Sequence, residues 1–556
     1  MSSKQAGGPD GPETTGAAAS GSRPEPEAAR SGSGRRSSGG RSAGRWAAGL
    51  LLLAGTGALV AGSSLPGFPL EGERAADRTA EIPFAEVPAG PLTGVCPEPP
   101  RLLSGNVAGT DAEFSAESKS ARSVVSAVVL AAAGSQLPAA GLATVSNAEP
   151  LATLSEGTSG DAPLAGTRTG AVVLDRQVSA AALLNAEPTG ALQATAGAAL
   201  TYTASDGDLR GLAAANCQSP ANDLWLVGAR TTVGATAVLQ LTNPSQTSAD
   251  VDLELFGSSG PVEGAGSRGI AVGPGETKSV VLAGLAANQE SLAVRVRSSG
   301  GPVAAVIAQN VLRGLTPGGV ELIQPTAAPA PGQVISGVRI PNPDATRKLA
   351  GKEGYGSVVP SLQVAAPGAS DAVVNLRILG PDGEVPLEGG GSYNVAAGTV
   401  SRIPLDSLPE GTFTLDLSSD VAVTAAAVVS RGTEEGTDLA VAPAGERLGS
   451  EHLAVLPAGE SRLSFTAPDG QAQVRLSAVN SDGVLLGEKT MDLAAGGTVS
   501  VAPADLGKAA AAVLVSTSGS AVYGAQTVTA ADTGVSILTL PRGNTGGARV
   551  QVEIGY

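Results

Sequence analysis

The sequence predicts an all-β body of tandem β-sandwich domains, preceded by a disordered segment and one transmembrane helix. Three observations predict this arrangement. A 15-residue pattern, with Gly at its fifth place and Leu at its fifteenth, occurs at 271–285, 394–408 and 492–506. Short runs that alternate apolar and polar residues fill most of the body, with turn residues roughly every 8–12 positions. One uncharged apolar run lies near the N-terminus.

Residues 1–45 consist mainly of Gly, Ser, Pro and Ala with scattered charges and no apolar periodicity. Such a segment cannot offset its ordering entropy by burial, so we predict a disordered cytoplasmic leg. Its net charge is +3, which leaves −19 for the rest of a chain whose total is −16. An acidic body repels phosphate backbones, so no nucleic-acid partner is expected.

The apolar run begins at Trp46 and continues without charge to Leu65. As a helix it would be about 30 Å long, which matches the hydrocarbon core of a bilayer. With Arg41 and Arg45 before it, the run predicts a signal-anchor at 46–66 with the C-terminal body outside the cell. A cleaved signal peptide, which would give a secreted protein, and a buried soluble helix are the alternatives.

The body divides by its repeats and cysteines. We predict an extended linker at 67–95, an N-terminal β domain at 96–222, and sandwich repeats at 223–325, 326–445 and 446–556. Cys96 and Cys217 are the only cysteines. In an exported protein an isolated pair favours a disulfide, here between the first and last strands of the first domain. A redox or metal-binding pair would need closer spacing or neighbouring histidines.

Each of the three repeats follows one plan. Two alternating strands precede the 15-residue pattern, two follow it, and a Gly-led apolar run ending in Pro closes the unit ("GGVELIQP", "GTDLAVAP" and "GVSILTLP"). Six or seven strands in about 100 residues is typical of an immunoglobulin-like or fibronectin-like sandwich. A β-propeller is the alternative fold, although its blades need only about 40–45 residues.

The sequence offers no catalytic motif. His452 is the single histidine, so we expect a solvated residue at a strand edge rather than a zinc ligand. "GAGSRG" at 264–269 matches G-x-G-x-x-G but lies between strands, which favours a loop. The acidic turns at 205–210 and 433–438 are expected to be solvated loops, with weak calcium binding as the alternative. We therefore predict no enzyme activity, no cofactor, and no catalytic or metal-binding residues.

The apolar anchor and the stretch "RGLAAANCQSPANDLWLVGARTTVGATAVLQLTNPSQTSADVDLELFG" at 210–257 resemble an actinobacterial family, domain of unknown function 5719. The resemblance covers roughly residues 40–556. It implies a membrane-anchored, extracytoplasmic protein and brings no known reaction.

These observations together predict a non-enzymatic binding or structural component of the cell envelope. Its expected partners are the membrane, through one helix, and cell-wall glycan or another envelope protein. The alternative is a protein that binds or hydrolyses envelope glycans with a carboxylate pair, most plausibly in 96–220.

Overall fold

The computed structural model describes residues 84–86, 89–102, 118–132, 134–157, 168–189, 193–434, 436–530, 534–543 and 549–551. Their regular secondary structure is mainly β-strand, which confirms the all-β prediction. Among them no helix has the length and apolar character needed to cross a bilayer. The predicted leg at 1–45, the predicted span at 46–66 and most of the linker at 67–95 lie outside the described residues.

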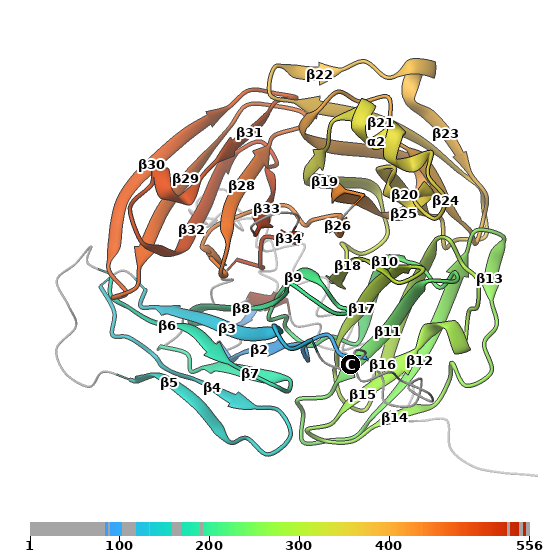
Figure 1. The fold of residues 1–556 in the computed structure, drawn as a ribbon. Helices are drawn as coiled ribbons and strands as arrows, with labels where there is room; N and C mark the ends of the chain where they lie inside the picture. The colour runs from blue at the N-terminus through green and yellow to red at the C-terminus, as the bar shows by residue number, and fades with distance from the viewer. Residues whose placement is uncertain are drawn as a thin grey trace, which may run out of the picture. The chain divides into compact units, whose positions relative to one another are not determined.

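Thirty-three of the described strands, β2 to β34, form four modules of two sheets each, and Figure 1 labels most of them. In module 1 the first sheet has the order β2 (Leu92–Cys96), β7 (Ala182–Ala186), β4 (Ala139–Thr144), β5 (Pro150–Glu156). Its second sheet has the order β6 (Gly170–Gln177), β3 (Arg122–Leu130), β8 (Thr195–Ala204), β9 (Gly211–Asn216).

Module 2 repeats this order. Its first sheet is β10 (Asp223–Ala229), β16 (Leu292–Ser299), β12 (Ala249–Gly257) and β13 (Gly260–Val262), with β14 (Ile270–Val272) also beside β12. Its second sheet is β15 (Thr277–Val281), β11 (Ala235–Thr242), β17 (Ala304–Arg313) and β18 (Thr316–Ile323).

In module 3 one long strand, β25 (Gly411–Thr433), belongs to both sheets. Its first part pairs with β19 (Ala330–Ile340) and β21 (Ala372–Gly380), and β21 pairs with β22 (Gly383–Val385) and β23 (Ser392–Val395). Its second part lies between β20 (Ser361–Ala365) and β26 (Gly436–Pro443), and β20 pairs with β24 (Val400–Pro404).

Module 4 has the first sheet β27 (His452–Val455), β32 (Ala510–Gly519), β29 (Ala472–Asn480), β30 (Leu485–Leu493). Its second sheet is β31 (Thr498–Val501), β28 (Glu460–Thr466), β33 (Tyr523–Thr529), β34 (Val535–Thr539). A separate pair joins β1 (Phe84–Glu86) to β35 (Arg549–Gln551). The helical elements are α2 (Pro343–Ala350), η1 (Leu282–Gly284), η2 (Gly356–Val358), η3 (Glu388–Gly391) and η4 (Pro503–Asp505).

We number the strands of each module from 1 to 8 in chain order, with β25 counted as both 6 and 7 and with the additional strands β14 and β23 left out. All four modules then share one strand order, 1-6-3-4 in the first sheet and 5-2-7-8 in the second. An immunoglobulin sandwich also pairs its second strand with its fifth and its third with its sixth. In the immunoglobulin sandwich, however, the first strand lies beside the second and the seventh beside the sixth. Here the first strand lies beside the sixth and the seventh beside the second, so the first and seventh strands have exchanged sheets. The immunoglobulin order is thus not reproduced. A propeller blade is a single sheet, so that alternative does not describe the modules either.

The recurring 15-residue pattern is the crossing between the two sheets of a module. In each copy it leaves an outer strand of the first sheet and enters the edge strand of the second, from β14 to β15, β23 to β24 and β30 to β31. The Gly at its fifth place has positive φ each time, 68° at Gly275, 70° at Gly398 and 72° at Gly496. A residue with a Cβ is strained in this region, so the turn favours Gly there.

The strands follow their sequence patterns. β12, β21 and β29 occupy the same place in three modules and each begins with buried and exposed residues in strict alternation. Such alternation buries one face of a sheet against its partner and leaves the other to solvent. The cores are built of Val, Leu, Ile and Ala with few aromatic rings.

The four modules pack against one another and do not form a row of separate domains. Residues Ile82–Tyr556 form one compact unit. The core of module 2 includes Ala426 and Val441 of module 3, and the core of module 3 includes Ile537 of module 4. The core of module 1 takes in Leu322 of module 2, and a further cluster joins Leu130 to Leu453 of module 4. Apolar packing is therefore continuous across all four boundaries.

Candidate functional site

The last strands of the four modules, β9, β18, β26 and β34, contact one another within this unit (Figure 1). Each is the outermost strand of its sheet and pairs on one side only, with β8, β17, β25 and β33 respectively. The N–H and C=O groups on the other side need partners once they are buried. Polar side chains on these same strands supply many of these hydrogen-bond partners.

Asp438 on β26 is the centre of this arrangement. Its side chain is fully buried. Oδ2 accepts hydrogen bonds from the backbone N–H of Leu212 in module 1 at 2.8 Å and of Val535 in module 4 at 3.0 Å. Oδ1 accepts from Val320 in module 2 and from Leu439 beside it, each at 3.0 Å. One carboxylate thus bonds to all four modules.

Two glycines allow this close approach. Gly211 and Gly319 precede Leu212 and Val320 and have φ of 147° and 115°. A Cβ at either position would lie 2.5 Å from Oδ1 of Asp438. Both the positive φ and the missing side chain are therefore required for these strands to present their N–H groups to the carboxylate.

Glu321 on β18 forms a second buried bridge. Oε1 accepts from the N–H of Leu322 and from the hydroxyl of Ser536 on β34, both at 2.8 Å. Oε2 accepts a longer bond, 3.4 Å, from the N–H of Val441 on β26. The same Ser536 hydroxyl accepts from the N–H of Ala214 on β9 at 3.1 Å. This second set of hydrogen bonds again involves all four modules.

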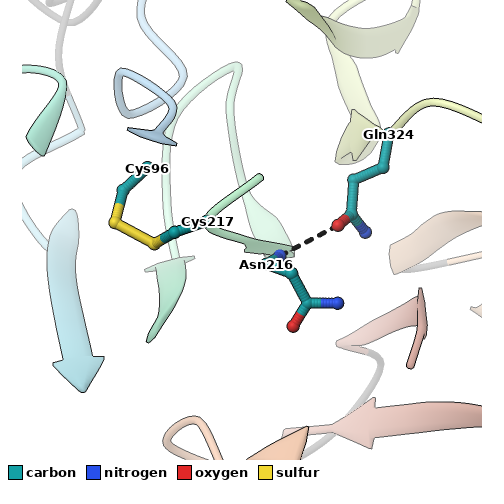
Figure 2. Close-up of a disulfide and its surroundings, with 4 residues drawn as sticks. All are labelled: Cys96, Asn216, Cys217 and Gln324. Atoms are coloured by element: carbon teal, nitrogen blue, oxygen red, sulfur yellow. Dashed lines mark hydrogen bonds between the residues drawn. A yellow bond between two sulfur atoms is a disulfide. The ribbon is translucent and has the colours of Figure 1, made fainter. Parts of the chain in front are cut away.

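A third bridge lies beside the disulfide (Figure 2). Asn216 donates its backbone N–H to Oε1 of Gln324 at 2.9 Å and its side-chain N–H to the carbonyl of Thr539 at 2.7 Å. The next residue is Cys217, which is bonded to Cys96 on β2. The predicted disulfide is therefore present, and it ties the first strand of module 1 to the residue that follows its last strand. We define Asn216, Glu321, Gln324, Asp438 and Ser536 as the central polar cluster.

Burial raises the pKa of both central carboxyls. It raises that of Asp438 to about 7, although backbone N–H groups act in the opposite direction. It raises the pKa of Glu321 well above its ordinary value, and the charge of Asp438 adds to the effect. Because the folded-state pKa values exceed the unfolded ones, the protonated forms favour the fold. The contribution of Asp438 to stability is complete below about pH 4 and is lost as the pH rises through about 7. The contribution of Glu321 has the same sign.

We therefore expect the melting temperature to fall more steeply between about pH 5 and about pH 8 in the native chain than in Glu321→Gln, in which only Asp438 of the two central carboxyls still titrates. Thermal melts in a series of buffers measure the two slopes. Glu384→Gln, at an exposed position, is the matched control and should keep the native slope. Equal slopes in the native chain and Glu321→Gln would contradict this account.

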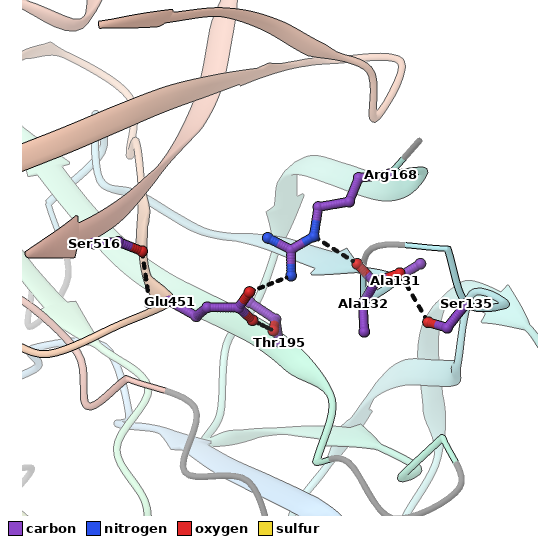
Figure 3. Close-up of polar contacts among 7 residues, drawn as sticks. All are labelled: Ala131, Ala132, Ser135, Arg168, Thr195, Glu451 and Ser516. Carbon is purple, nitrogen blue, oxygen red and sulfur yellow. Dashed lines mark hydrogen bonds and ion pairs between the residues drawn. The ribbon is translucent and has the colours of Figure 1, made fainter. Parts of the chain in front are cut away.

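The boundary between modules 4 and 1 has its own polar contact (Figure 3). Arg168 donates from Nη2 to Oε1 of Glu451 at 2.6 Å and from Nε to the carbonyl of Ala131 at 3.0 Å. Thr195 donates to Oε2 of Glu451 at 2.9 Å. The Arg168 side chain is only 11% exposed, so this pair is better shielded from solvent than most surface ion pairs.

Replacing Arg168 by Ala leaves a partly buried carboxylate without its cation, and we expect the free energy of unfolding to fall by about 1–3 kcal/mol. Urea denaturation measures the loss, and hydrogen exchange should show faster opening of β8 and β27. Arg347→Ala is the control, since its pair with Asp344 on α2 is exposed and should contribute less than about 1 kcal/mol. Equal losses in the two variants would contradict a role in closing this boundary.

The chain matches the model of a family of unknown function, DUF5719, over residues 172–504. That is more than half of the 556 residues. The chain belongs to DUF5719. The matched part begins in β6 of module 1 and ends in η4 of module 4, and it includes Gly211, Gly319, Glu321 and Asp438.

Other comparisons add little to the DUF5719 assignment. No curated protein matches the chain. Among solved structures, the biofilm-associated protein BSP domain aligns with 83% of this chain and 96% of its own at 9% identity, with a TM-score of 0.12. A score that low carries no argument about fold or function.

A groove of ≈ 550 Å³ lies between modules 2 and 3 of this DUF5719 chain. On one wall Arg295 lies 5.2 Å from the ring of Trp225 and pairs with Asp223 at 2.6 Å and Glu254 at 3.3 Å. Trp225 stacks on Phe256 with ring centroids 5.6 Å apart. Small residues at 367–370 and 421–422 line the other wall. The groove has the size of ordinary ligand sites.

Several sequence expectations can be compared with this DUF5719 structure. "GAGSRG" is a loop between β13 and β14, as expected. His452 is not solvated, so that expectation is wrong. The residue is 5% exposed, because β27 packs against the segment after β34, where Nδ1 lies 2.7 Å from the carbonyl of Pro541. Nε2 accepts from the N–H of Gly449 at 2.6 Å, and burial lowers the pKa of the ring.

The two acidic turns lie in the hairpins β8–β9 and β25–β26. Asp206 remains exposed, with the hydroxyls of Ser118 and Ser120 bonded to it. Asp438, by contrast, is buried rather than solvated, because its hairpin leads into the centre of the unit. Within the described residues no group of three or more His, Cys, Asp or Glu could hold a metal ion. The signal that could have found the centre is a polar residue inside each closing apolar run, at Glu321, Asp438 and Ser536.

Proposed function

We propose that this chain is a single-pass, membrane-anchored, extracytoplasmic protein of the actinobacterial cell envelope that binds a ligand without transforming it. Its modules, which we infer to be variants of the immunoglobulin-like sandwich, form one rigid support. The disulfide between Cys96 and Cys217 supports an oxidising location. The observation that carries the binding function is the groove beside Trp225.

Three features favour the groove as a binding site. It lies between two modules whose cores are continuous, so its walls are held in place without a ligand. Trp225, one of the few aromatic residues, lines its wall, and Phe256 stacks on that ring from within the core of module 2. The carboxylates of Asp223 and Glu254 are partly exposed at its edge, where they can accept hydrogen bonds from hydroxyl groups. Cell-wall glycan is the ligand class that fits this edge best, with a segment of another envelope protein as the alternative.

The test of the groove is to fill it. Ala369 lines the groove and is exposed, so Ala369→Trp should block it without disturbing a core. Binding to purified cell-wall sacculi and to a glycan array should fall at least about tenfold. Ala345→Trp, at an exposed position on α2, is the matched control and should bind normally. Undiminished binding by Ala369→Trp would reject the groove as the site.

The same experiment addresses glycan hydrolysis. Asp223 and Glu254 both line the groove, but each is paired with Arg295. Binding without release of soluble fragments supports the non-enzymatic function. Release that stops in Glu254→Gln would favour a hydrolase instead.

The lysines provide a test of location. Lys4 is the single lysine in the predicted cytoplasmic leg, and six others lie in the body, among them the exposed Lys348 and Lys489. A membrane-impermeant amine reagent applied to intact cells should modify body lysines and leave Lys4 unmodified. Modification of Lys4 alone would reverse the proposed orientation, and modification of none would place the body inside the cell.

A further inference from the structure

The boundary between modules 4 and 1 joins two modules that are not consecutive in the chain, so no linker between neighbouring modules crosses it. β27 of module 4 lies at this boundary and contacts β8 of module 1. Leu453 and Val455 of β27 share a buried apolar cluster with Val128, Leu130 and Ala199 of module 1. The closure of this boundary therefore depends on where β27 is held.

His452, the single histidine, begins β27 and fixes the turn before it. Nδ1 lies 2.7 Å from the carbonyl oxygen of Pro541, a group that can only accept a hydrogen bond. Nε2 lies 2.6 Å from the backbone nitrogen of Gly449, whose N–H can only donate. The ring must therefore carry a proton on Nδ1 and none on Nε2, and only the neutral ring satisfies both partners.

A second proton on this ring has no acceptor. It would point from Nε2 at the N–H of Gly449, so that two donors face each other. Gly543 lies against the same nitrogen, since a Cβ at that position would be 2.9 Å from Nε2. The ring is also buried, so there is little room for a water molecule to accept the new N–H. Burial lowers the pKa of the ring for the same reason.

The same turn carries the carboxylate that links the two modules. Glu451 has a φ of 59°, a conformation that residues with a side chain seldom adopt. Its N–H donates to Ser516 at 3.1 Å, and its carboxylate accepts from Arg168 and Thr195 of module 1 (Figure 3). Without the bond from the turn to the histidine ring, this strained conformation loses part of its support. The carboxylate is then no longer held toward module 1.

The charged groups near the ring do not offset this effect. Glu446 favours the protonated ring, but its carboxylate is already paired with Arg542 at 2.6 and 3.0 Å. Arg447 opposes a further positive charge, and Glu451 is bonded to module 1. β32, which pairs with β27, and β8, which packs on it, contain no acidic or basic residue.

We propose that His452 is an acid-sensitive switch at the boundary between modules 4 and 1. When the ring gains a second proton, the turn at 449–452 rearranges and β27 separates from β8. The central polar cluster and the pairing of β1 with β35 still join the modules, so the opening is local. The contribution of the neutral ring to stability is complete above about pH 7 and is lost progressively below about pH 6.5, opposite in sign to that of the central carboxyls.

The test compares amide hydrogen exchange at about pH 7.5 and about pH 5 in the full 556-residue chain, with rates corrected for the intrinsic pH dependence of exchange. At about pH 5 a ring with an ordinary pKa near 6.5 is about thirtyfold more often protonated than neutral. We therefore expect protection in β27 and β8 to fall about tenfold to thirtyfold. β12 in module 2 is the internal reference and should keep its protection. Unchanged protection in β27, or an equal loss in β12, would overturn the inference.

His452→Gln separates the ring from the other titrating groups. Glutamine offers a donor and an acceptor but stays neutral, so protection in β27 should be the same at both pH values. A loss equal to that of the native chain would overturn the inference and assign the effect to a carboxyl.

A second measurement needs no variant, because selective isotope labelling of the single histidine gives unambiguous ring signals in the native chain. These signals should show the Nδ1–H tautomer at about pH 7.5 and ionisation at a lower pH than in an exposed histidine. The Nε2–H tautomer, or titration like that of an exposed histidine, would also overturn the inference.

Discussion

Asp438→Ala should lower the free energy of unfolding by at least about 4 kcal/mol. The substitution leaves four buried backbone N–H groups, at Leu212, Val320, Leu439 and Val535, without their acceptor. A buried donor that loses its partner costs about 1–3 kcal/mol, and losses in one network are not simply additive. Because three of the donors belong to other modules, we expect loss of cooperative unfolding as well. Urea denaturation followed by circular dichroism measures both.

Asp438→Asn is an instructive companion to this variant. It keeps the volume and one acceptor oxygen, but its NH₂ group would face two N–H donors, so it should also be destabilised. The matched control is Asp420→Asn in the same module, where the carboxylate accepts one N–H, from Val373 at 2.8 Å, at an exposed turn. We expect a loss below about 1 kcal/mol there. If Asp438→Ala were no more harmful than the control, the carboxylate would not hold the modules together.

Removing the disulfide should have the second large effect. Cys96 and Cys217 are 121 residues apart in sequence, and the chain-entropy model gives about 5 kcal/mol for closing a loop of this length. The paired replacement Cys96→Ser with Cys217→Ser should therefore destabilise module 1 strongly. Cys217 also follows Asn216, which bonds to Gln324 and Thr539, so we expect exchange protection to fall in β9 first. Hydrogen exchange by mass spectrometry resolves the module that opens.

Reduction of the native chain provides a check on that variant. Dithiothreitol should lower the unfolding midpoint of the native protein to that of the double-serine variant and should leave the variant unchanged. A native midpoint that does not respond to reduction, with the bond shown to be open, would mean that central packing alone holds module 1. That result would contradict a stabilising role for the bond.

Much of the fold could be predicted from local sequence. Strands such as β12 and β21 carry their apolar residues at every second position, and the period of two already defines the buried face. The glycines at 275, 398 and 496 mark the crossings because only their conformation fits the turn. Module 1 was harder to relate to the others, since it lacks the 15-residue pattern, yet it has the same strand order.

The candidate sites were less predictable. Trp225 and Arg295 are distant in sequence from 367–370 on the opposite wall of the groove. The anchor at 46–66, which depends on hydropathy alone, stays a prediction.

The sequence by itself determined the class of the fold, the repeated unit and the cysteine pair, because these depend on periodicity, turn chemistry and counting within short stretches. Only the tertiary structure decided that the four modules pack against one another. It also decided that Asp438 and Glu321 are buried at the centre, where they accept hydrogen bonds from other modules, and do not lie in a solvated loop or at an exposed edge. The physical reason is that a strand edge needs partners for its backbone groups. Which side chain supplies them depends on strands more than 100 residues away, such as β9 and β26, that meet only when the whole chain has folded.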